Sequence, residues 1–284
     1  MATPLYRLLM LDIDGTLLNE QGQITPRTRR AVGAAQAAGV VVALATARRH
    51  LSATLFAADL GLKGPVVSYD GALIREYPSG EHWHSDPLPA VTGQAAVDAI
   101  ARHSLQPLAQ YNQENSERVL TGPQSQDTPW MGDYYDLYAA QFVRYPLAEL
   151  CVGKGDPLRI VAFGPLEQLE PIAAELRPLP CQLYLNPQGS YGTAELSVMS
   201  LTTSKGNALS VLGSRLRLAP DQSMALGDSY NDLSMLRLAG LGVAMGQAPQ
   251  EVQTAAGAVT LPNTEDGAAR AIERYLLDGK LPEE

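Results

Sequence analysis

The chain has 284 residues, of which 45% are hydrophobic and 18% are charged. A chain of this size and composition can bury an ordinary hydrophobic core, which excludes a disordered protein and one that depends on a disulfide scaffold. The 21 basic and 30 acidic residues give a net charge of −9, which disfavours a nucleic acid or an anionic membrane as the main partner.

The two cysteines, Cys151 and Cys181, are too few for a disulfide framework and lack the spacing of a zinc site. The longest apolar stretch, residues 40–45, is far shorter than the roughly 20 residues of a membrane helix. The first residues lack the basic start and long apolar core of a signal peptide. We therefore expect a cytoplasmic protein with two reduced thiols. No sequence feature indicates the oligomeric state, for which a monomer or weak dimer is the expectation.

The first 70 residues alternate between apolar runs and amphipathic segments. Short, continuous apolar runs predict strands buried on both faces at residues 8–11, 40–45 and 65–69. The helix before the second strand is predicted to begin at Thr25-Pro26 and to end at Gly39. A further helix is predicted over residues 48–60. This alternation indicates a parallel sheet with helices on its faces.

The pattern changes after the third strand. Alternating segments at residues 73–77 and 82–84, separated by turn residues, predict a β-hairpin. Residues 90–190 are richer in Pro, Gln and Tyr and have mixed periodicity, and residues 106–126 predict no element. The turn-rich segment 186–190 is interpreted as the end of this region.

The α/β alternation returns after residue 190. Further strands are predicted at residues 196–199, 223–226, 242–245 and 258–261. Helices are predicted over residues 204–216 and 231–239 and from residue 264. We therefore predict an α/β fold: a doubly wound, mostly parallel, Rossmann-like sheet built from residues 1–86 and 190–284. Residues 87–189 are predicted to be an inserted α+β domain.

Polar residues follow several of the predicted strands. Asp12 and Asp14 follow the first strand, Thr46 follows the second, and Asp228 and Asp232 follow a strand late in the chain. Open parallel sheets bind ligands outside the carboxyl ends of their strands, so we expect these side chains to lie together. Crowded carboxylates are costly unless a cation lies among them, and oxygen ligands suit Mg²⁺.

Lys205 supports the same interpretation. Ser204 is a predicted N-cap, which places Lys205 in the first helical turn, where the helix dipole disfavours a cation. We therefore expect an anion, either a carboxylate or a bound phosphate, opposite Lys205. Gly206 would let the backbone approach that ligand closely. Each of these segments alone is common in ordinary turns, and it is their combination that indicates a site.

The combination resembles the four motifs of the haloacid dehalogenase superfamily. The matching segments are Asp12-Ile13-Asp14-Gly15-Thr16-Leu17, Thr46, Lys205-Gly206 and Gly227-Asp228-Ser229-Tyr230-Asn231-Asp232. The large insert, together with Asn231, resembles the Cof-type phosphatases, which carry the second type of cap (C2B). This chain has Thr46-Ala47-Arg48 where the family usually has Thr-Gly-Arg, and Asp70-Gly71 where it often has Asn-Gly.

The resemblance implies a Mg²⁺-dependent phosphatase that hydrolyses small phosphorylated metabolites, either sugar phosphates or phosphorylated cofactors. It implies that Asp12 forms an aspartyl-phosphate, that Asp14 is the general acid and base, and that Lys205 neutralises charge. The residues implied to contact phosphate or substrate are Thr46, Ala47, Arg48, Lys205 and Asn231. Those implied to hold Mg²⁺ are Asp12, Asp14 through its backbone carbonyl, Asp228 and Asp232. The insert would control access of the substrate.

Alternatives remain open at this stage. A phosphomutase or phosphotransferase of the same superfamily would pass the phosphoryl group to an acceptor other than water. A phosphoacceptor domain or a phosphometabolite-binding protein would not turn over, although an acid at position 14 favours turnover over storage. Asp70 could affect substrate choice or cap a turn. Aromatic residues of the insert fit packing as well as binding, and no substrate role is assigned to Tyr111, Trp130, Tyr134, Tyr135 or Tyr138.

Overall fold

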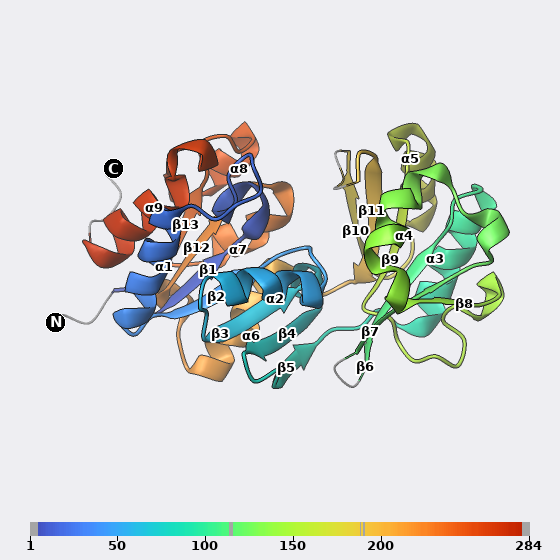
Figure 1. The fold of residues 1–284 in the computed structure, drawn as a ribbon, viewed down its shortest axis with the longest axis horizontal. Helices are drawn as coiled ribbons and strands as arrows, with labels where there is room; N and C mark the ends of the chain where they lie inside the picture. The colour runs from blue at the N-terminus through green and yellow to red at the C-terminus, as the bar shows by residue number, and fades with distance from the viewer. Residues whose placement is uncertain (1–4, 114–115, 188, 190, 280–284) are drawn as a thin grey trace. The chain divides into compact units, whose positions relative to one another are not determined.

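The computed structural model describes residues 5–113, 116–187, 189 and 191–279 (Figure 1). The chain divides into two compact units. The core unit comprises Met1–His84 and Ser204–Glu284, and the insert unit comprises Ser85–Thr203. Among the described residues, no helix combines the length and apolarity that crossing a membrane would require.

The core unit contains an eight-stranded sheet in the order β14-β13-β12-β1-β2-β3-β4-β5. All neighbours from β14 to β3 pair in parallel, and β4 runs antiparallel to β3. The bounds are Leu8–Leu11 (β1), Val41–Ala45 (β2), Gly64–Ser68 (β3), Leu73–Tyr77 (β4), His82–Ser85 (β5), Ser223–Gly227 (β12), Leu241–Ala244 (β13) and Ala258–Val259 (β14). The predicted mostly parallel sheet is confirmed.

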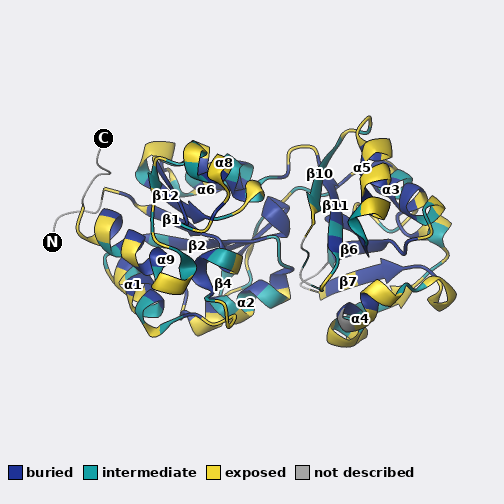
Figure 2. Cartoon of the chain, turned by 90° about the horizontal axis from the view of Figure 1, so that it is seen from above, coloured by how far each residue is buried: buried dark blue, intermediate teal, exposed yellow. Residues whose placement is uncertain are grey.

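Helices cover both faces of this sheet because its strands are apolar on both faces. Leu9 and Leu11 of β1 pack in one apolar cluster with residues of the helices α1 (Pro26–Ala37), α2 (His50–Asp59) and α9 (Gly267–Ala271). Leu8 and Met10 pack in a second cluster with α6 (Lys205–Leu216), α7 (Leu233–Leu238) and α8 (Gln250–Ala255). The buried strands lie between these two helix layers (Figure 2). The predicted doubly wound arrangement is therefore confirmed.

The strand order reverses between β1 and β12. The first part of the chain adds β2 and β3 on one side of β1, and the part after the insert adds β12, β13 and β14 on the other side. In open α/β sheets the loops diverge at such a switch point and leave a crevice at the carboxyl ends of the strands. The loops after β1 and β12 are therefore the expected position of a site.

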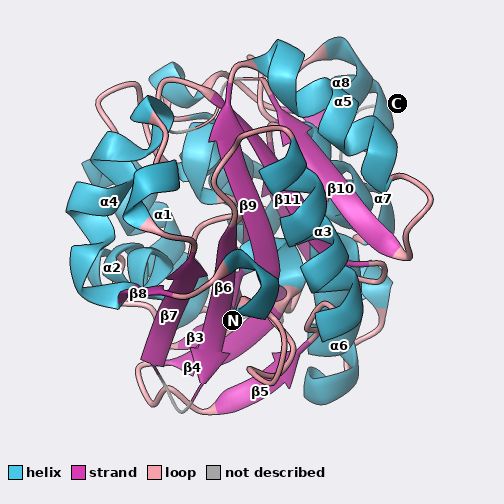
Figure 3. Ribbon diagram, turned by 90° about the vertical axis from the view of Figure 1, so that its right-hand side faces the viewer, coloured by secondary structure: helices cyan, strands magenta, loops and turns pink. Residues whose placement is uncertain are grey.

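The insert unit contains a six-stranded sheet in the order β10-β11-β9-β6-β7-β8 (Figure 3). Its neighbours pair antiparallel except for β7 and β8, which are parallel. The bounds are Leu108–Gln113 (β6), Ser116–Thr121 (β7), Phe142–Arg144 (β8), Arg159–Gly164 (β9), Cys181–Asn186 (β10) and Ala194–Ser200 (β11). Helices α3 (Ala90–Arg102) and α5 (Leu166–Leu176) pack in one apolar cluster with this sheet.

A separate apolar cluster of the insert unit is aromatic. It includes Tyr134 of the short helix α4 (Gly132–Tyr138), whose ring lies 5.2 Å from that of Phe163 and 5.1 Å from that of Tyr191. Tyr135 and Tyr138 pack against the same cluster. Tyr111 instead joins the α3–α5 cluster and donates its hydroxyl to the Leu150 carbonyl. These contacts are packing contacts within the insert unit.

The structure places the end of the insert later than the predicted boundary at residue 190. Strand β11, which was expected in the core sheet, lies between β10 and β9 in the insert sheet. Strand β11 fits the insert sheet because its apolar residues alternate with polar ones. Leu196 and Val198 pack in the α3–α5 cluster, whereas Ser197 lies on the other face of the sheet. The turn-rich segment 186–190 begins at Asn186, the last residue of β10, and precedes β11 in the sequence, so it does not mark the boundary between the units. Residues 188 and 190 of this segment lie outside the described residues.

The polar segment 106–126 also differs from expectation, because it contains strands β6 and β7. Their polar residues hid a regular antiparallel pairing, from Leu108 opposite Thr121 to Gln113 opposite Ser116. Gln110 and Thr121 are polar residues at buried positions, so these strands lack the alternation of apolar and polar residues that identifies a half-exposed strand. Both cysteines are thiols, Cys151 buried and Cys181 partly buried.

Candidate active site

Three carboxylates meet at the switch point of the core sheet. Asp12 directly follows β1, and Asp228 directly follows β12. Asp232 lies in the helical turn that precedes α7. One ligand oxygen from each of these residues lies within 4.8 Å of the others. The adjacent strand ends of the parallel sheet therefore bring together residues more than 200 positions apart in the sequence.

Lys205 connects two of these carboxylates. Its Nζ donates to Asp12 Oδ1 at 2.6 Å and to Asp232 Oδ1 at 2.5 Å. Ser204 caps helix α6 by accepting the backbone N–H of Asn207, as predicted, so the helix begins at Lys205. The side chain of Lys205 is fully buried. The anion expected opposite Lys205 is therefore a pair of carboxylates.

Asp232 also organises the backbone beside it. Its Oδ2 accepts the backbone N–H groups of Asp228 and Ser229, both at 3.0 Å. A side chain on Gly227 would place a Cβ atom 2.5 Å from the Cβ of Asp232, so only glycine fits this approach. Because both oxygens of Asp232 already accept hydrogen bonds, this residue primarily positions Lys205 and the loop that carries Asp228.

The loop after β1 is fitted closely against Asp228. Gly15 has a φ of 78°, and a Cβ at this position would lie 2.2 Å from Asp228 Oδ2. Thr16 donates its hydroxyl to Asp228 Oδ1 at 3.2 Å. Gln247, which follows β13, donates its side-chain amide to the Gly15 carbonyl at 2.5 Å. No sequence pattern predicts a role for Gln247, because a lone glutamine in a loop has no distinctive spacing.

Burial and mutual repulsion dominate the electrostatics of the cluster. Burial raises the pKa of Asp12 well above its usual range, and Asp232 and Asp228 add to this effect while Lys205 opposes it. Burial and the neighbouring Asp232 raise the pKa of Asp228 to about 7. Burial acts to lower the pKa of Lys205, but the two carboxylates outweigh it and the pKa is raised. The cluster thus carries more carboxylate groups than its single ammonium group can neutralise.

The side chain of Asp14 is not one of the three carboxylates of this cluster. Arg48 binds it in a two-pronged ion pair, with Nε 2.7 Å from Oδ2 and Nη2 2.6 Å from Oδ1. Arg48 is itself held on α2, because Nη1 donates to Ser52 and the guanidinium lies 4.9 Å from the centre of the Phe56 ring. The side chain of Asp14 is 53% exposed. Arg48, expected to contact substrate, therefore contacts the expected general acid and base.

Thr46 is buried at the end of β2, beside the same loop. Its Oγ1 accepts the backbone N–H of Arg48 at 3.1 Å, which leaves the hydroxyl proton available to donate elsewhere. Ala47 has a negative φ. The alanine in place of the usual family glycine therefore needs no left-handed backbone here.

A turn over residues 69–71 lies next to three of the site's loops. Tyr69 and Asp70 are buried and have left-handed φ angles of 52° and 53°, which cost non-glycine residues on the order of 1–3 kcal/mol each. The carboxylate of Asp70 accepts the side-chain amide of Asn231 at 2.7 Å. Asp70 therefore does more than cap a turn, since it contacts the loop that carries Asp228 and Asp232.

The residues of the cluster fit a magnesium ion. All candidate donors are carboxylate oxygens, which are the ligands that a hard divalent cation prefers, and the three carboxyl groups outnumber the single ammonium group of Lys205. Asp12 and Asp228 have fewer internal hydrogen bonds than Asp232 and are the best placed to be direct ligands. Asp232 would act beside them or through water.

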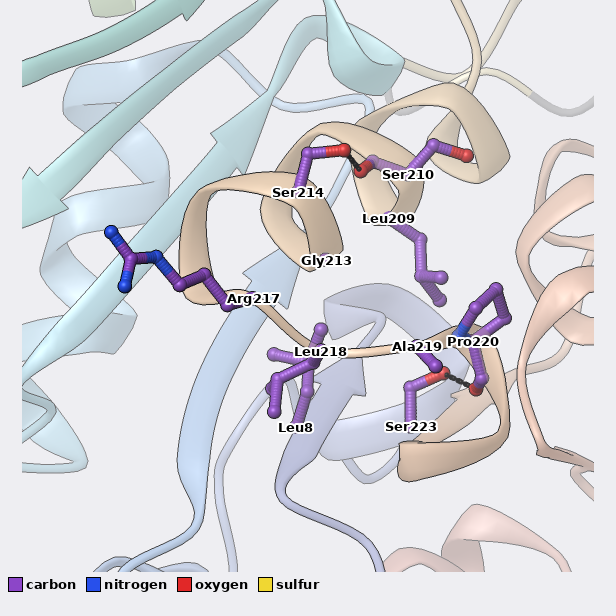
Figure 4. A pocket seen from close by; sticks show the side chains of 10 residues that line it. All are labelled: Leu8, Leu209, Ser210, Gly213, Ser214, Arg217, Leu218, Ala219, Pro220 and Ser223. Carbon is purple, nitrogen blue, oxygen red and sulfur yellow. Dashed lines mark hydrogen bonds between the residues drawn. The ribbon is translucent and has the colours of Figure 1, made fainter.

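A separate pocket of about 340 Å³ lies against α6 and the first residues of β1 and β12 (Figure 4). Its lining includes Leu8 and Ser223, which begin β1 and β12, and Arg217, which follows α6. The acidic cluster lies at the opposite ends of the same strands. The pocket is therefore not part of the candidate active site.

Comparison with known proteins places this geometry in a family. The model of the haloacid dehalogenase-like hydrolases matches residues 9–272. The chain belongs to this family, as the motif resemblance indicated. It is 30% identical to phosphatase YwpJ of Bacillus subtilis, over 95% of this chain and all of the relative. It is 25% identical to pyridoxal phosphate phosphatase YbhA of Escherichia coli, over 95% of this chain and 99% of the relative.

Solved structures agree on the fold. A haloacid dehalogenase-like hydrolase from Bacteroides thetaiotaomicron superposes with a TM-score of 0.79 at 28% identity, covering 95% of this chain and all of the other. A sugar phosphatase of subclass IIB, BT4131, superposes with a TM-score of 0.74 at 23% identity, covering 95% and 98% of the two chains. The second likeness concerns the fold alone. The expected family and the expected fold, a Rossmann-like sheet with a large inserted α+β domain, are therefore confirmed.

Proposed function

We propose that the protein is a Mg²⁺-dependent phosphatase that hydrolyses small phosphorylated metabolites through an aspartyl-phosphate on Asp12. The observation that carries the proposal is the buried cluster in which Lys205 binds Asp12 and Asp232 beside Asp228. Such a cluster can hold a divalent cation beside a nucleophilic carboxylate at the carboxyl ends of parallel strands. Relatives named as phosphatases support the reaction class.

In this proposal Asp12 attacks the phosphorus atom. A carboxylate and a phosphate dianion repel each other, so positive charge must be fixed beforehand. Lys205 supplies one such charge at 2.6 Å from Asp12. Bound Mg²⁺, held by Asp12, the Asp14 backbone carbonyl and Asp228, would supply Lewis-acid stabilisation of the phosphoryl oxygens. Thr46 would donate its hydroxyl to a phosphoryl oxygen, beside the backbone of Ala47.

The leaving group requires a general acid, and the water that hydrolyses the intermediate requires a general base. Asp14 would protonate the leaving oxygen and then accept a proton from the water that hydrolyses the aspartyl-phosphate. Its carboxylate is partly exposed and accepts two hydrogen bonds from Arg48, and both observations support this role. Asn231 would contact the substrate from the loop after β12.

The substrate class follows from the relatives and the insert. The name of YbhA gives pyridoxal phosphate, a phosphorylated cofactor, as its substrate. We propose a small phosphate monoester, either a sugar phosphate or a phosphorylated cofactor, with the insert unit acting as a cap that controls access. We propose neither a nucleic acid nor a membrane as the main partner, because the net charge of −9 disfavours both.

The test measures release of inorganic phosphate from a panel of phosphorylated metabolites, with Mg²⁺ and with a chelator. We expect Mg²⁺-dependent release that Asp12→Asn abolishes, because the variant lacks the nucleophile. Asp221→Asn is a matched control, because Asp221 lies in the turn before β12, at the opposite end of that strand. Transfer to a sugar acceptor without free phosphate would indicate a mutase, and binding without either reaction would indicate a phosphometabolite-binding protein.

A further inference from the structure

The turn over residues 69–71 touches three loops of the candidate site but has no place in the proposed reaction. Tyr69 donates its backbone N–H to the Arg48 carbonyl, and Asp70 donates its backbone N–H to the Thr46 carbonyl, both at 3.0 Å. A Cβ on Gly71 would lie 2.4 Å from the carbonyl oxygen of Ser204, which caps the helix of Lys205. Two consecutive left-handed, non-glycine residues persist in this turn because these contacts hold it.

The side chain of Asp70 points from this turn to Asn231. Its Oδ1 accepts the Asn231 Nδ2 at 2.7 Å, and the whole residue is 3% exposed. An ionised carboxylate can only accept hydrogen bonds, so the amino group of the Asn231 amide must face Asp70. The amide oxygen must then face away from Asp70. An asparagine at position 70 would not impose this orientation, because it can donate as well as accept.

The amide oxygen of Asn231, which faces away from Asp70, has no hydrogen-bond partner among the described residues. Asn231 Oδ1 is buried and accepts no hydrogen bond from any described residue. A buried acceptor without a donor is destabilising, and such groups in folded proteins usually mark a missing partner. Asn231 lies in the loop between Asp228 and Asp232. The missing donor is therefore expected to arrive with a ligand of the site.

We infer that Asp70 is a positioning residue that turns the Asn231 amide so that its oxygen accepts a hydrogen bond from the bound substrate complex. The inference rests on the proposed function. The donor is either a hydroxyl or N–H group of the substrate or a water molecule bound to the metal, and the two share the same chemistry at Asn231. Asp70 acts through Asn231 and does not touch the reacting atoms.

The test compares Asp70→Ala with a control that has the same backbone conformation. Asp266 also has a left-handed φ of 57°, and its Oδ1 accepts the Thr25 hydroxyl at 2.6 Å. Asp266→Ala therefore loses a similar hydrogen bond and a similar backbone preference away from the site. We expect similar losses of melting temperature in both variants, but a fall in kcat/KM of about 10–100-fold only in Asp70→Ala, as for other residues that orient a site group. Equal activity in the two variants would overturn the inference.

The exchange variant Asp70→Asn/Asn231→Asp separates positioning from structural support. In this variant the amide at position 70 donates to the carboxylate at position 231, so the hydrogen bond is kept. The group at position 231 that faces the ligand is then a carboxylate instead of an amide. We expect it to recover the melting temperature lost in Asn231→Asp without recovering kcat/KM. Recovery of both would show that the pair is only structural and would overturn the inference.

Two substrates identify the source of the donor. The nitrophenyl group of p-nitrophenyl phosphate carries no hydroxyl or N–H group, whereas glucose 6-phosphate carries several hydroxyls. A greater loss of kcat/KM in Asp70→Ala with glucose 6-phosphate would assign the donor to the substrate, and equal losses would assign it to metal-bound water.

If the wild type hydrolyses nothing, the proposed function fails, and calorimetric binding of Mg²⁺ with inorganic phosphate tests the inference separately. Binding weakened in Asp70→Ala but not in Asp266→Ala supports it, and unchanged or absent binding overturns it.

Discussion

Lys205 illustrates how single residues of this site depend on their surroundings. A fully buried ammonium group is strongly unfavourable unless carboxylates lie against it. Here Asp12 and Asp232 both do so, within 2.6 Å. The same contacts hold Asp12 in one orientation, so the charge that stabilises the buried lysine also aligns the proposed nucleophile.

The Arg48–Asp14 pair gives a testable prediction at this scale. Arg48→Ala removes both hydrogen bonds that hold the Asp14 carboxylate. If Asp14 protonates the leaving group, poor leaving groups suffer most, because good ones depart without a proton. We expect kcat for an alkyl phosphate to fall about tenfold more than kcat for p-nitrophenyl phosphate, since general acid catalysis contributes roughly 10²–10⁴-fold.

Arg48→Lys is the informative control for this prediction. Lysine keeps the positive charge but cannot form the two-pronged contact. An intermediate loss with the same dependence on the leaving group would assign the effect to orientation of Asp14. An equal loss for both substrates would instead place Arg48 in substrate binding, as the family resemblance implied.

At the scale of elements, helix α2 is joined to the core sheet through a buried histidine. His50 begins α2, and its Nδ1 lies 3.5 Å from the hydroxyl of Ser68 in β3. Burial, together with the nearby cation of Arg75 in β4, lowers the pKa of His50 to about 4. The helix therefore packs against the sheet with a neutral imidazole between them.

The stability of the fold should depend on pH through His50. Between pH 6.5 and 4 the unfolded chain binds a proton at this residue that the folded chain does not. The free energy of unfolding should therefore fall as pH decreases through this range, by up to about 3 kcal/mol from this residue. Urea unfolding at several pH values checks this, with His50→Asn as the comparison. A variant with the same pH dependence as the wild type would contradict the assignment.

At the scale of the whole chain, the two units have separate hydrophobic cores. Two apolar clusters belong to the core unit and two to the insert unit. The insert sheet depends on β11, which pairs with both β10 and β9. The chain must therefore complete the insert sheet before it returns to the core at α6.

The boundary can be tested with two fragments. A fragment of residues 85–203 contains every strand of the insert sheet and should unfold cooperatively in urea, with the circular dichroism of a mixed α/β protein. A fragment of residues 87–189 lacks β11 and leaves β10 without its neighbour, so it should not fold cooperatively. Matching unfolding midpoints for the two fragments would refute the boundary at residue 203.

Local signals predicted most of the core unit. Continuous apolar runs identified its strands, and Thr25 and Ser204 marked helix starts through side-chain caps that the structure contains. These signals depend on neighbouring residues, so they can be read without knowledge of the fold. Local patterns do not predict which strands pair. The pattern of residues 194–200 identifies a strand, but not the sheet to which this strand belongs.

Sequence patterns alone predicted the α/β core, the acidic residues at its strand ends and the family. Three features are seen only in the folded chain: Arg48 binds Asp14, Asp70 binds Asn231, and β11 belongs to the insert sheet. Strand and helix formation follow from periodicity and caps over a few residues. Contacts between residues 34 or 161 positions apart depend on how whole elements pack, which no local pattern encodes.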